Sequence, residues 1–263
     1  MKAKSIKGNS PQEIKAALEN AMSDGYTPTL AIIFISVKQD HKAICKLMDD
    51  ASIAVFGCTT NGEFIDEVTE KGSVAILLLN INKNYFQIYF EEYPEKNYRE
   101  ITNSIAHKAK ETFAVPAFFI AGSNMETDAE ELLFGFEDVV GKDVNVYGSM
   151  AGDDFTFAEQ FVFTNKHASS RGLVCIAFDE DKIMIKGVAT CGWKAVGTER
   201  TVTKSSGNHV FTVDDIPVLD ITTKYGGREN VSPDNEGLLL EIAANFPLQL
   251  QREKGVPVMR PGL

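Results

Sequence analysis

A short pattern occurs twice in this chain: an apolar strand runs into a turn that contains glycine, and an acidic residue follows. The copies span Val55–Phe64 and Val146–Phe155, and their acidic residues are Glu63 and Asp153. Glycine at a strand end permits a positive φ or lets another group approach the backbone closely. Two such turns predict a site that the chain builds from two related halves.

The predicted elements around the two turns occur in the same order, which is difficult to obtain by chance. Around the first turn they are helix, strand, helix, strand and then two more strands: Pro11–Met22, Leu30–Val37, His41–Asp49, Ser52–Phe56, Ser73–Ile81 and Tyr85–Glu91. Around the second turn the same kinds of element are Tyr98–Phe113, Ala117–Ala121, Ala129–Val140, Val144–Tyr147, Leu173–Phe178 and Ile183–Thr190.

The strands are of two kinds. Leu30–Ile35 and Val74–Leu79 are continuous apolar runs, which are typical of strands covered on both faces. Tyr85–Phe90 tends to alternate, as an antiparallel strand with one wetter face does. We therefore expect an α/β (α+β) fold with two duplicated αβαβββ halves, at about residues 10–92 and 97–191, in which helices flank mixed sheets.

A hairpin and a further helix are expected after the two halves. Thr201–Val213 is predicted to form two strands around a Gly207-Asn208 turn. Val218–Tyr225 is predicted to be helical, and Gly226 and Gly227 would end that helix.

Charge and cysteine content limit the classes of function. The chain has 263 residues and a formal net charge of −11, which opposes binding to a phosphate backbone, so no nucleic-acid partner is expected. No apolar run reaches the roughly 18 residues that a membrane span needs, and no secretory signal pattern follows the first lysines. Four cysteines without C-x-x-C spacing indicate reduced thiols. A cytoplasmic protein without membrane insertion is expected.

The sequence lacks the motifs of common enzyme chemistry, namely the phosphate loop G-x-x-x-x-G-K-[ST], the dinucleotide fingerprint G-x-G-x-x-G and the zinc motif H-E-x-x-H. Cys58 and Ser149 occupy corresponding turn positions and leave a cysteine or serine hydrolase open, but no base is evident for either. The acidic residues near Glu63 lack a calcium-loop pattern, so no metal site is expected. Glu63 or Asp153 could instead receive the amine of a ligand. We favour a protein without catalytic activity.

Four segments, in this order and at these separations, resemble the FIST domain: Gly57–Glu63, Tyr147–Asp153, Gly192–Gly197 and Val202–Val210. The resemblance covers the chain from about Leu30 onward, and Asn245–Leu248 with Arg260 is similar to the start of the companion FIST C-terminal domain. It implies a FIST N-terminal sensory domain at residues 1–218 and the beginning of a truncated C-terminal domain at 219–263.

The resemblance also implies a cytoplasmic signal-input module that binds a small ligand, such as an amino acid, and is not an enzyme. FIST domains occur alone, beside genes of signalling systems, or fused to histidine kinases, chemotaxis receptors and cyclic-dinucleotide enzymes. A separate signalling protein of one of these kinds is the expected partner. No cofactor is expected, but some relatives bind haem, which leaves a haem-binding gas sensor as an alternative with His167 or His209 as axial ligand.

We expect the two turns to meet at the strand ends and to line a small polar pocket with backbone amides, hydroxyl groups and an acid. The single tryptophan, Trp193, would add an aromatic wall. The predicted ligand residues are Gly57, Cys58, Thr59, Thr60, Asn61, Gly62, Glu63, Gly148, Ser149, Gly152, Asp153 and Trp193.

Overall fold

A computed structural model of the chain describes residues 1–156, 158–188, 193–207, 209–227, 245–251 and 257–260. The chain divides into two compact units, Met1–Val188 and Ala189–Leu263, and each is described by itself. Among the described residues, none of the helices combines the length and the apolar character that crossing a membrane requires.

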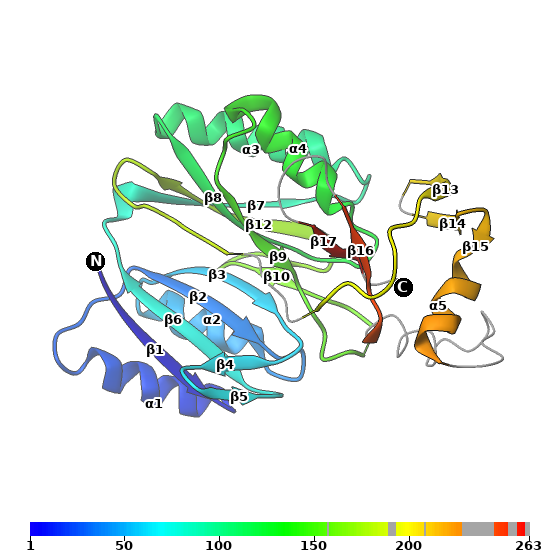
Figure 1. The fold of residues 1–263 in the computed structure, drawn as a ribbon. Helices are drawn as coiled ribbons and strands as arrows, with labels where there is room; N and C mark the ends of the chain where they lie inside the picture. The colour runs from blue at the N-terminus through cyan, green and yellow to red at the C-terminus, as the bar shows by residue number, and fades with distance from the viewer. Residues whose placement is uncertain (157, 189–192, 208, 228–244, 252–256, 261–263) are drawn as a thin grey trace. The chain divides into compact units, whose positions relative to one another are not determined.

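The first unit contains two sheets and the helices that cover them (Figure 1). Its first part contributes β1 (Lys2–Gly8), α1 (Pro11–Met22), β2 (Leu30–Ile35), α2 (His41–Asp50), β3 (Ala54–Thr59), β4 (Glu63–Ile65), β5 (Val68–Glu70), β6 (Val74–Asn80) and the 3-10 helix η1 (Lys83–Tyr85). Its second part contributes β7 (Phe86–Glu92), α3 (Tyr98–Thr112), β8 (Pro116–Gly122), α4 (Ala129–Val140), β9 (Val146–Met150), β10 (Val162–Phe163), β11 (Ala168–Ser169) and β12 (Gly172–Asp179).

The two sheets repeat one topology. The six-stranded sheet has the order β1-β6-β2-β3-β10-β11, in which β2 and β3 are parallel and β6 is antiparallel to β1 and β2. The four-stranded sheet has the order β7-β12-β8-β9, in which β8 and β9 are parallel and β12 is antiparallel to β7 and β8. The first four strands of one sheet thus have the arrangement of the whole other sheet.

The predicted α/β class, with mixed sheets flanked by helices, is confirmed, but two edge strands differ from the expectation. The strand predicted at Tyr85–Glu91, last in the first half, is β7 (Phe86–Glu92) and pairs with β12 in the second sheet. Lys2–Gly8, where no strand was expected, is β1 and takes the corresponding place beside β6. The order within each half is therefore βαβαββ. An alternating strand suits the edge of either sheet, and only tertiary packing decides which one it joins.

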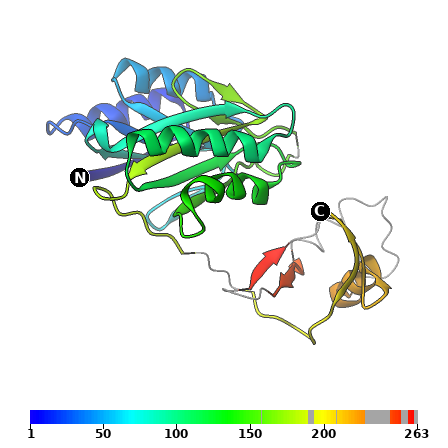
Figure 2. The same ribbon diagram turned by 90° about the horizontal axis from the view of Figure 1, so that it is seen from above.

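The sheets pack face to face between two layers of helices (Figures 1 and 2). Their inner faces share an apolar cluster, in which the ring centroids of Phe56 in β3 and Phe119 in β8 lie 4.9 Å apart. On the outer faces, α1 and α2 pack around Ile14 and Ile44, and α3 and α4 pack around Phe136. The central strands are apolar on both faces because both faces are covered.

Short polar side chains fix where the helices begin. Ser10 Oγ accepts a hydrogen bond from the Glu13 amide at 3.2 Å and caps α1. Asp40 Oδ1 accepts one from the Ala43 amide at 3.0 Å and caps α2. Such a cap satisfies an amide that has no partner inside the helix. The cap at Asp40 starts α2 soon after the carboxyl end of β2, beside the first glycine turn.

The second unit begins with a small antiparallel sheet of β13 (Val202–Ser206), β14 (His209–Val213) and β15 (Ile216–Pro217), followed by α5 (Val218–Gly226). A separate pair of strands, β16 (Leu248–Leu250) and β17 (Val258–Arg260), is antiparallel. The predicted hairpin and helix are therefore present. Two residues of the predicted pattern, Gly192 and Asn208, lie outside the described residues.

The predicted strand Ile183–Thr190 is wrong over its described part. Residues 183–188 belong to no strand, and Thr190 lies outside the described residues. Ile183 and Ile185 pack partly against the cluster between the sheets, whereas Met184 is exposed. The apolar residues of this segment alternate because only one side of it contacts the core, and the segment does not pair with a described strand.

The helices α3 and α4 meet closely at a glycine, and this contact is testable. A Cβ atom on Gly135 of α4 would overlap Thr102 Oγ1 and the carbonyl oxygen of Arg99 in α3. Alanine favours a helix over glycine by about 1 kcal/mol, but overpacking of this kind costs about 1–3 kcal/mol. Thermal denaturation should therefore show a lower midpoint for Gly135→Ala. A midpoint at or above that of the wild type would contradict this close contact.

Candidate functional site

The two glycine turns lie against each other and are joined by backbone hydrogen bonds. The Gly152 amide donates to the carbonyl oxygen of Thr59 at 2.8 Å, and the Asp154 amide donates to that of Thr60 at 3.3 Å. Thr59 ends β3, and Gly152 lies two residues beyond the end of β9. The carboxyl ends of parallel strands are where α/β folds form binding crevices. The structure thus brings the two predicted turns together.

The side chain of Asn61 reinforces this junction. Its Oδ1 accepts hydrogen bonds from the amides of Asp153 at 2.8 Å and Phe155 at 3.3 Å. The fit leaves no room for a side chain on Gly152, because a Cβ atom there would stand 2.6 Å from Asn61 Oδ1. Asn61 is therefore a structural bridge between the turns.

The glycines that precede the turns are required for packing. A Cβ atom on Gly57 would overlap the ring of Phe163 in β10, and one on Gly148 would overlap the Ile120 carbonyl oxygen in β8. Gly148 also has φ +153°, and Gly62 in the first turn has φ +154°, which side chains rarely adopt. These residues shape the backbone at the junction.

The two predicted acids are buried, and groups of the fold already bond them. Glu63 Oε1 accepts a hydrogen bond from Thr60 Oγ1 at 2.6 Å, and Glu63 Oε2 accepts two from Ser73, from the amide at 3.0 Å and from Oγ at 2.9 Å. Asp153 Oδ2 accepts from the Ala158 amide at 2.9 Å and from Gln160 Nε2 at 3.2 Å. The hydrogen bonds to these two buried side chains therefore stabilise the conformation of the turns.

Asp154, the next residue, has an acceptor atom that is not used. Ser36 Oγ, which is buried at the end of β2, donates to Asp154 Oδ2 at 2.5 Å. Asp154 Oδ1 is also shielded from solvent but has no hydrogen-bond partner among the described residues. Asp154 and Phe155 have φ of +57° and +60°, the left-handed conformation that costs energy in residues with side chains. An unpartnered buried carboxylate oxygen is a place for a ligand's hydrogen-bond donor.

A second buried polar atom that has no hydrogen-bond partner among the described residues is Nε2 of His41, the first residue of α2. The His41 ring stacks against Phe161 at 5.7 Å and Phe163 at 5.2 Å between centroids. Phe161 is in turn bonded to the first turn, because the Thr59 amide donates to the Phe161 carbonyl oxygen at 2.9 Å. Burial, and secondarily the charge of Lys42, lower the pKa of His41. His41 thus borders the first turn as a neutral imidazole.

Sequence reasoning did not select Ser36, His41 or Asp154 as site residues. No local motif marks Ser36 or His41, and only the proximity of Asp154 to the second turn could have singled it out. Ser36 and Asp154 are 118 positions apart in the sequence, and only the folded chain brings them within hydrogen-bond distance.

Cys58 and Ser149 take no part in the hydrogen bonds that join the two turns within the described residues. Cys58 faces the cluster between the sheets, where burial raises the pKa of its thiol to about 12, so it stays protonated at neutral pH. Ser149 is exposed on β9 and its hydroxyl makes no hydrogen bond to any described residue. Trp193 belongs to the second unit, where it is 46 % exposed. The raised pKa of the Cys58 thiol is the opposite of what an activated thiol nucleophile needs.

The residues considered for cofactors and metals lie in different places. His167 is exposed with its ring against Phe90, and His209 is exposed on β14. Within the described ranges, no three His, Cys, Asp or Glu side chains lie close enough together to hold a metal ion.

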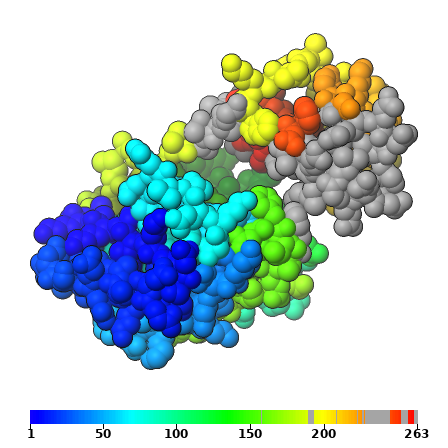
Figure 3. Space-filling model, turned by 90° about the horizontal axis from the view of Figure 1, so that it is seen from below, coloured from blue at the N-terminus to red at the C-terminus, as the bar shows by residue number. Residues whose placement is uncertain are grey.

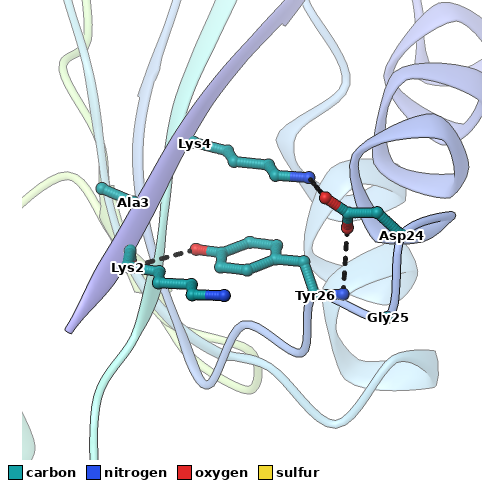
Figure 4. A pocket seen from close by; sticks show the side chains of 6 residues that line it. All are labelled: Lys2, Ala3, Lys4, Asp24, Gly25 and Tyr26. Carbon is teal, nitrogen blue, oxygen red and sulfur yellow. Dashed lines mark hydrogen bonds and ion pairs between the residues drawn. The ribbon is translucent and has the colours of Figure 1, made fainter.

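A hollow of about 290 Å³ lies elsewhere on the first unit, beside β1 (Figure 4). Two of its charged groups are already paired with each other: Lys4 Nζ lies 2.8 Å from Asp24, and it also lies 5.0 Å from the centre of the Tyr26 ring. None of the predicted ligand residues lines it: its walls are Lys2, Ala3, Lys4, Asp24, Gly25 and Tyr26.

The chain was compared with known proteins. The family model described as the FIST N domain matches residues 29–216, well over half of the chain and both glycine turns. No curated protein matches the chain.

Loss of the Asn61 bridge should destabilise the first unit. Asn61→Ala leaves the amides of Asp153 and Phe155 without their acceptor, which costs about 1–3 kcal/mol when such groups stay buried. Urea denaturation should show a lower unfolding free energy for Asn61→Ala and a smaller loss for Asn61→Asp, which keeps an acceptor oxygen. Equal stability of Asn61→Ala and the wild type would contradict the bridge.

The half-buried His41 should make stability depend on pH. Its pKa is lowered in the folded protein, whereas the unfolded chain binds the proton near the ordinary value of about 6.5. The free energy of unfolding should therefore decrease as the pH falls below about 6.5. His41→Phe keeps the aromatic stack and should flatten this part of the profile, measured by urea denaturation at a series of pH values. Profiles of the same slope in the wild type and in His41→Phe would contradict a lowered pKa of His41 in the folded protein.

Proposed function

Because this chain belongs to the FIST family, a family of sensory signal-transduction domains, we propose that it binds a small ligand at the junction of its two glycine turns. The ligand class we propose is a small molecule with an amine, such as an amino acid. The observation that supports this location best is Asp154 Oδ1, a shielded carboxylate oxygen without a partner among the described residues.

The surroundings of Asp154 suit an amine. Asp154 lies where the second turn meets Ser36 and Thr60, next to the carboxyl ends of the parallel strands β2 and β3. An ammonium group can donate to a carboxylate in a charge-assisted hydrogen bond, which is stronger than one between neutral groups. The start of α2 lies at the same strand end, and the positive end of a helix dipole favours a ligand's carboxylate. An amino acid carries both groups.

The predicted residues take different parts in this proposal. Thr59, Thr60, Asn61, Gly62, Glu63, Gly152 and Asp153 form and hold the two turns, and Asp154 joins them as the direct ligand contact. Gly57 and Gly148 support the strands beneath. Among the described residues, Cys58 and Ser149 make no contact that supports a part in this junction, and the proposal gives no part to Trp193 of the second unit.

We further propose that the domain is not an enzyme and passes its signal to a separate protein, such as a histidine kinase, a chemotaxis component or a cyclic-dinucleotide enzyme. Family membership supports the signalling part. The high pKa of the Cys58 thiol supports the absence of thiol catalysis. Free thiols at Cys45, Cys58 and Cys175 agree with a reducing cytoplasm.

Calorimetric titration with a panel of amino acids tests the site. Asp154→Asn keeps the size of the side chain and an acceptor for Ser36 but removes the charge. Because a hydrogen bond to a charged group contributes about 1.5–3 kcal/mol, the affinity for an amine ligand should fall about 10- to 100-fold. Asp143→Asn, in the exposed loop before β9, is the matched control and should bind as the wild type does.

Unchanged binding in Asp154→Asn would reject this location. Gly148→Val is unsuitable as a probe, because its side chain would collide with the Ile120 carbonyl oxygen and disturb the fold itself.

A further inference from the structure

The second glycine turn continues into a reversal of the chain at Asp154 and Phe155. The Thr156 amide donates a hydrogen bond to the carbonyl oxygen of Asp153 at 3.1 Å, and the two residues between them have φ of +57° and +60°. Two consecutive left-handed residues enclosed by such a bond are typical of a β-turn of type I′. Asparagine, aspartate and glycine usually occupy its central positions, because they adopt a positive φ most readily. A phenylalanine at the second central position is therefore unusual.

Another turn of this kind in the chain shows the ordinary choice of residues. Between β14 and β15, Asp214 and Asp215 have φ of +50° and +62°, and aspartate tolerates this conformation. Among the described residues other than glycine that have a positive φ, Phe155 is the only one with an apolar side chain. A bulky L-residue is strained in this conformation. The backbone at position 155 thus does not explain the aromatic ring.

Contact with the core does not explain the ring either. Phe155 is 62 % exposed, whereas Phe56, Phe118 and Phe136 are fully buried. Within the described residues, Phe155 belongs to none of the three apolar clusters of the first unit. The bright green atoms in Figure 3, which come from the part of the chain that contains the second turn, lie at the surface beside the blue atoms of the first part. The ring is therefore accessible to a molecule from solvent.

The junction itself imposes the strained conformation. Asn61 Oδ1 accepts hydrogen bonds from the amides of Asp153 and Phe155. The Asp154 amide, between them, donates to the carbonyl oxygen of Thr60. Three consecutive amides are thus bonded to the first turn, which fixes the backbone that carries the ring. Strained residues that the surrounding structure holds in this way cluster at binding sites, and a fixed backbone reduces the entropy that is lost when a ligand binds.

The ring belongs to the residue next to the proposed ligand contact. Phe155 follows Asp154, whose Oδ1 has no partner among the described residues, and the Cα atoms of neighbours joined by a trans peptide bond lie about 3.8 Å apart. In an amino acid, the side chain branches from the same carbon atom that carries the ammonium group. A ligand whose ammonium group binds Asp154 therefore carries its side chain within reach of the Phe155 ring.

Given the amine site proposed at Asp154, on which this inference rests, we propose that Phe155 determines the specificity of that site by receiving an apolar side chain of the ligand. The ligand class is then an amino acid with an aliphatic or aromatic side chain. Packing such a side chain on the ring removes the apolar surface of both from water. A polar side chain gains less from this contact, because it gives up hydrogen bonds to water beside an apolar ring.

Calorimetric titration with leucine and asparagine, whose side chains are similar in size and shape, tests this preference. The wild type should bind leucine about 10-fold more tightly than asparagine. Phe155→Gly should lower the affinity for leucine about 10-fold and leave that for asparagine nearly unchanged, so that the preference disappears. Glycine adopts the left-handed conformation without strain, so the thermal midpoint of this variant should be at or above that of the wild type.

Two further variants serve as controls. Phe155→Tyr keeps an aromatic ring and should keep most of the preference for leucine. Val115→Ser removes another exposed apolar side chain of the first unit. Val115 lies just before the amino end of β8, whereas the junction lies at the carboxyl ends of the parallel strands, so this variant should bind both amino acids as the wild type does.

The outcomes distinguish this inference from the proposed function. A wild type that binds neither amino acid, or an Asp154→Asn variant that binds both as tightly as the wild type does, would overturn the amine site and the part of Phe155 together. If Asp154→Asn weakens the binding of both amino acids but folded Phe155→Gly keeps the preference for leucine, the amine site stands and the part of Phe155 is overturned. A wild type that binds both amino acids equally well would also overturn it.

Discussion

The contact between the apolar inner faces of the two sheets determines where the rest of the first unit lies. It buries Phe56 in a cluster against which the partly buried Phe119 packs, and full burial of a side chain of this size contributes about 1.5–3 kcal/mol. Since helices cover the outer faces as well, the central strands must be apolar on both sides. The same packing sets the ends of β3 and β9 beside each other, so the two glycine turns meet.

Much of this fold could be predicted from the sequence, because the spacing of apolar residues in an element indicates which of its faces are buried. The helix predicted at Pro11–Met22 has those bounds in the structure, and the apolar run Leu30–Ile35 is a central strand. The edge strands were harder. The lysine-rich segment Lys2–Gly8 gives little sign of β1, and alternation in Phe86–Glu92 cannot say which sheet that strand joins. Whether such a segment forms an edge strand, and in which sheet, depends on pairing with a strand far away in the sequence: β6 for β1 and β12 for β7.

The candidate site, like the fold, could be predicted only in part from the sequence. Glycine and acid patterns predicted where the turns are, and the structure places the turns in contact through Asn61 and Gly152. The chemistry at the junction could not be read from the pattern, because it depends on which polar atoms remain unpartnered after folding. Glu63 and Asp153 accept hydrogen bonds from other groups of the fold, whereas one carboxylate oxygen of Asp154 has no partner among the described residues. Ser36 and His41 reach the site only through tertiary contacts.

The joined turns are the central claim, and amide hydrogen exchange measured by NMR tests them directly. The amides of Gly152 and Asp154 donate to Thr59 and Thr60, and that of Asp153 donates to Asn61. If the turns form one unit with the sheets, these three amides should exchange slowly, together with the amides of β3. Exchange at the rate of an exposed loop, while β3 remains protected, would show that the turns are not joined.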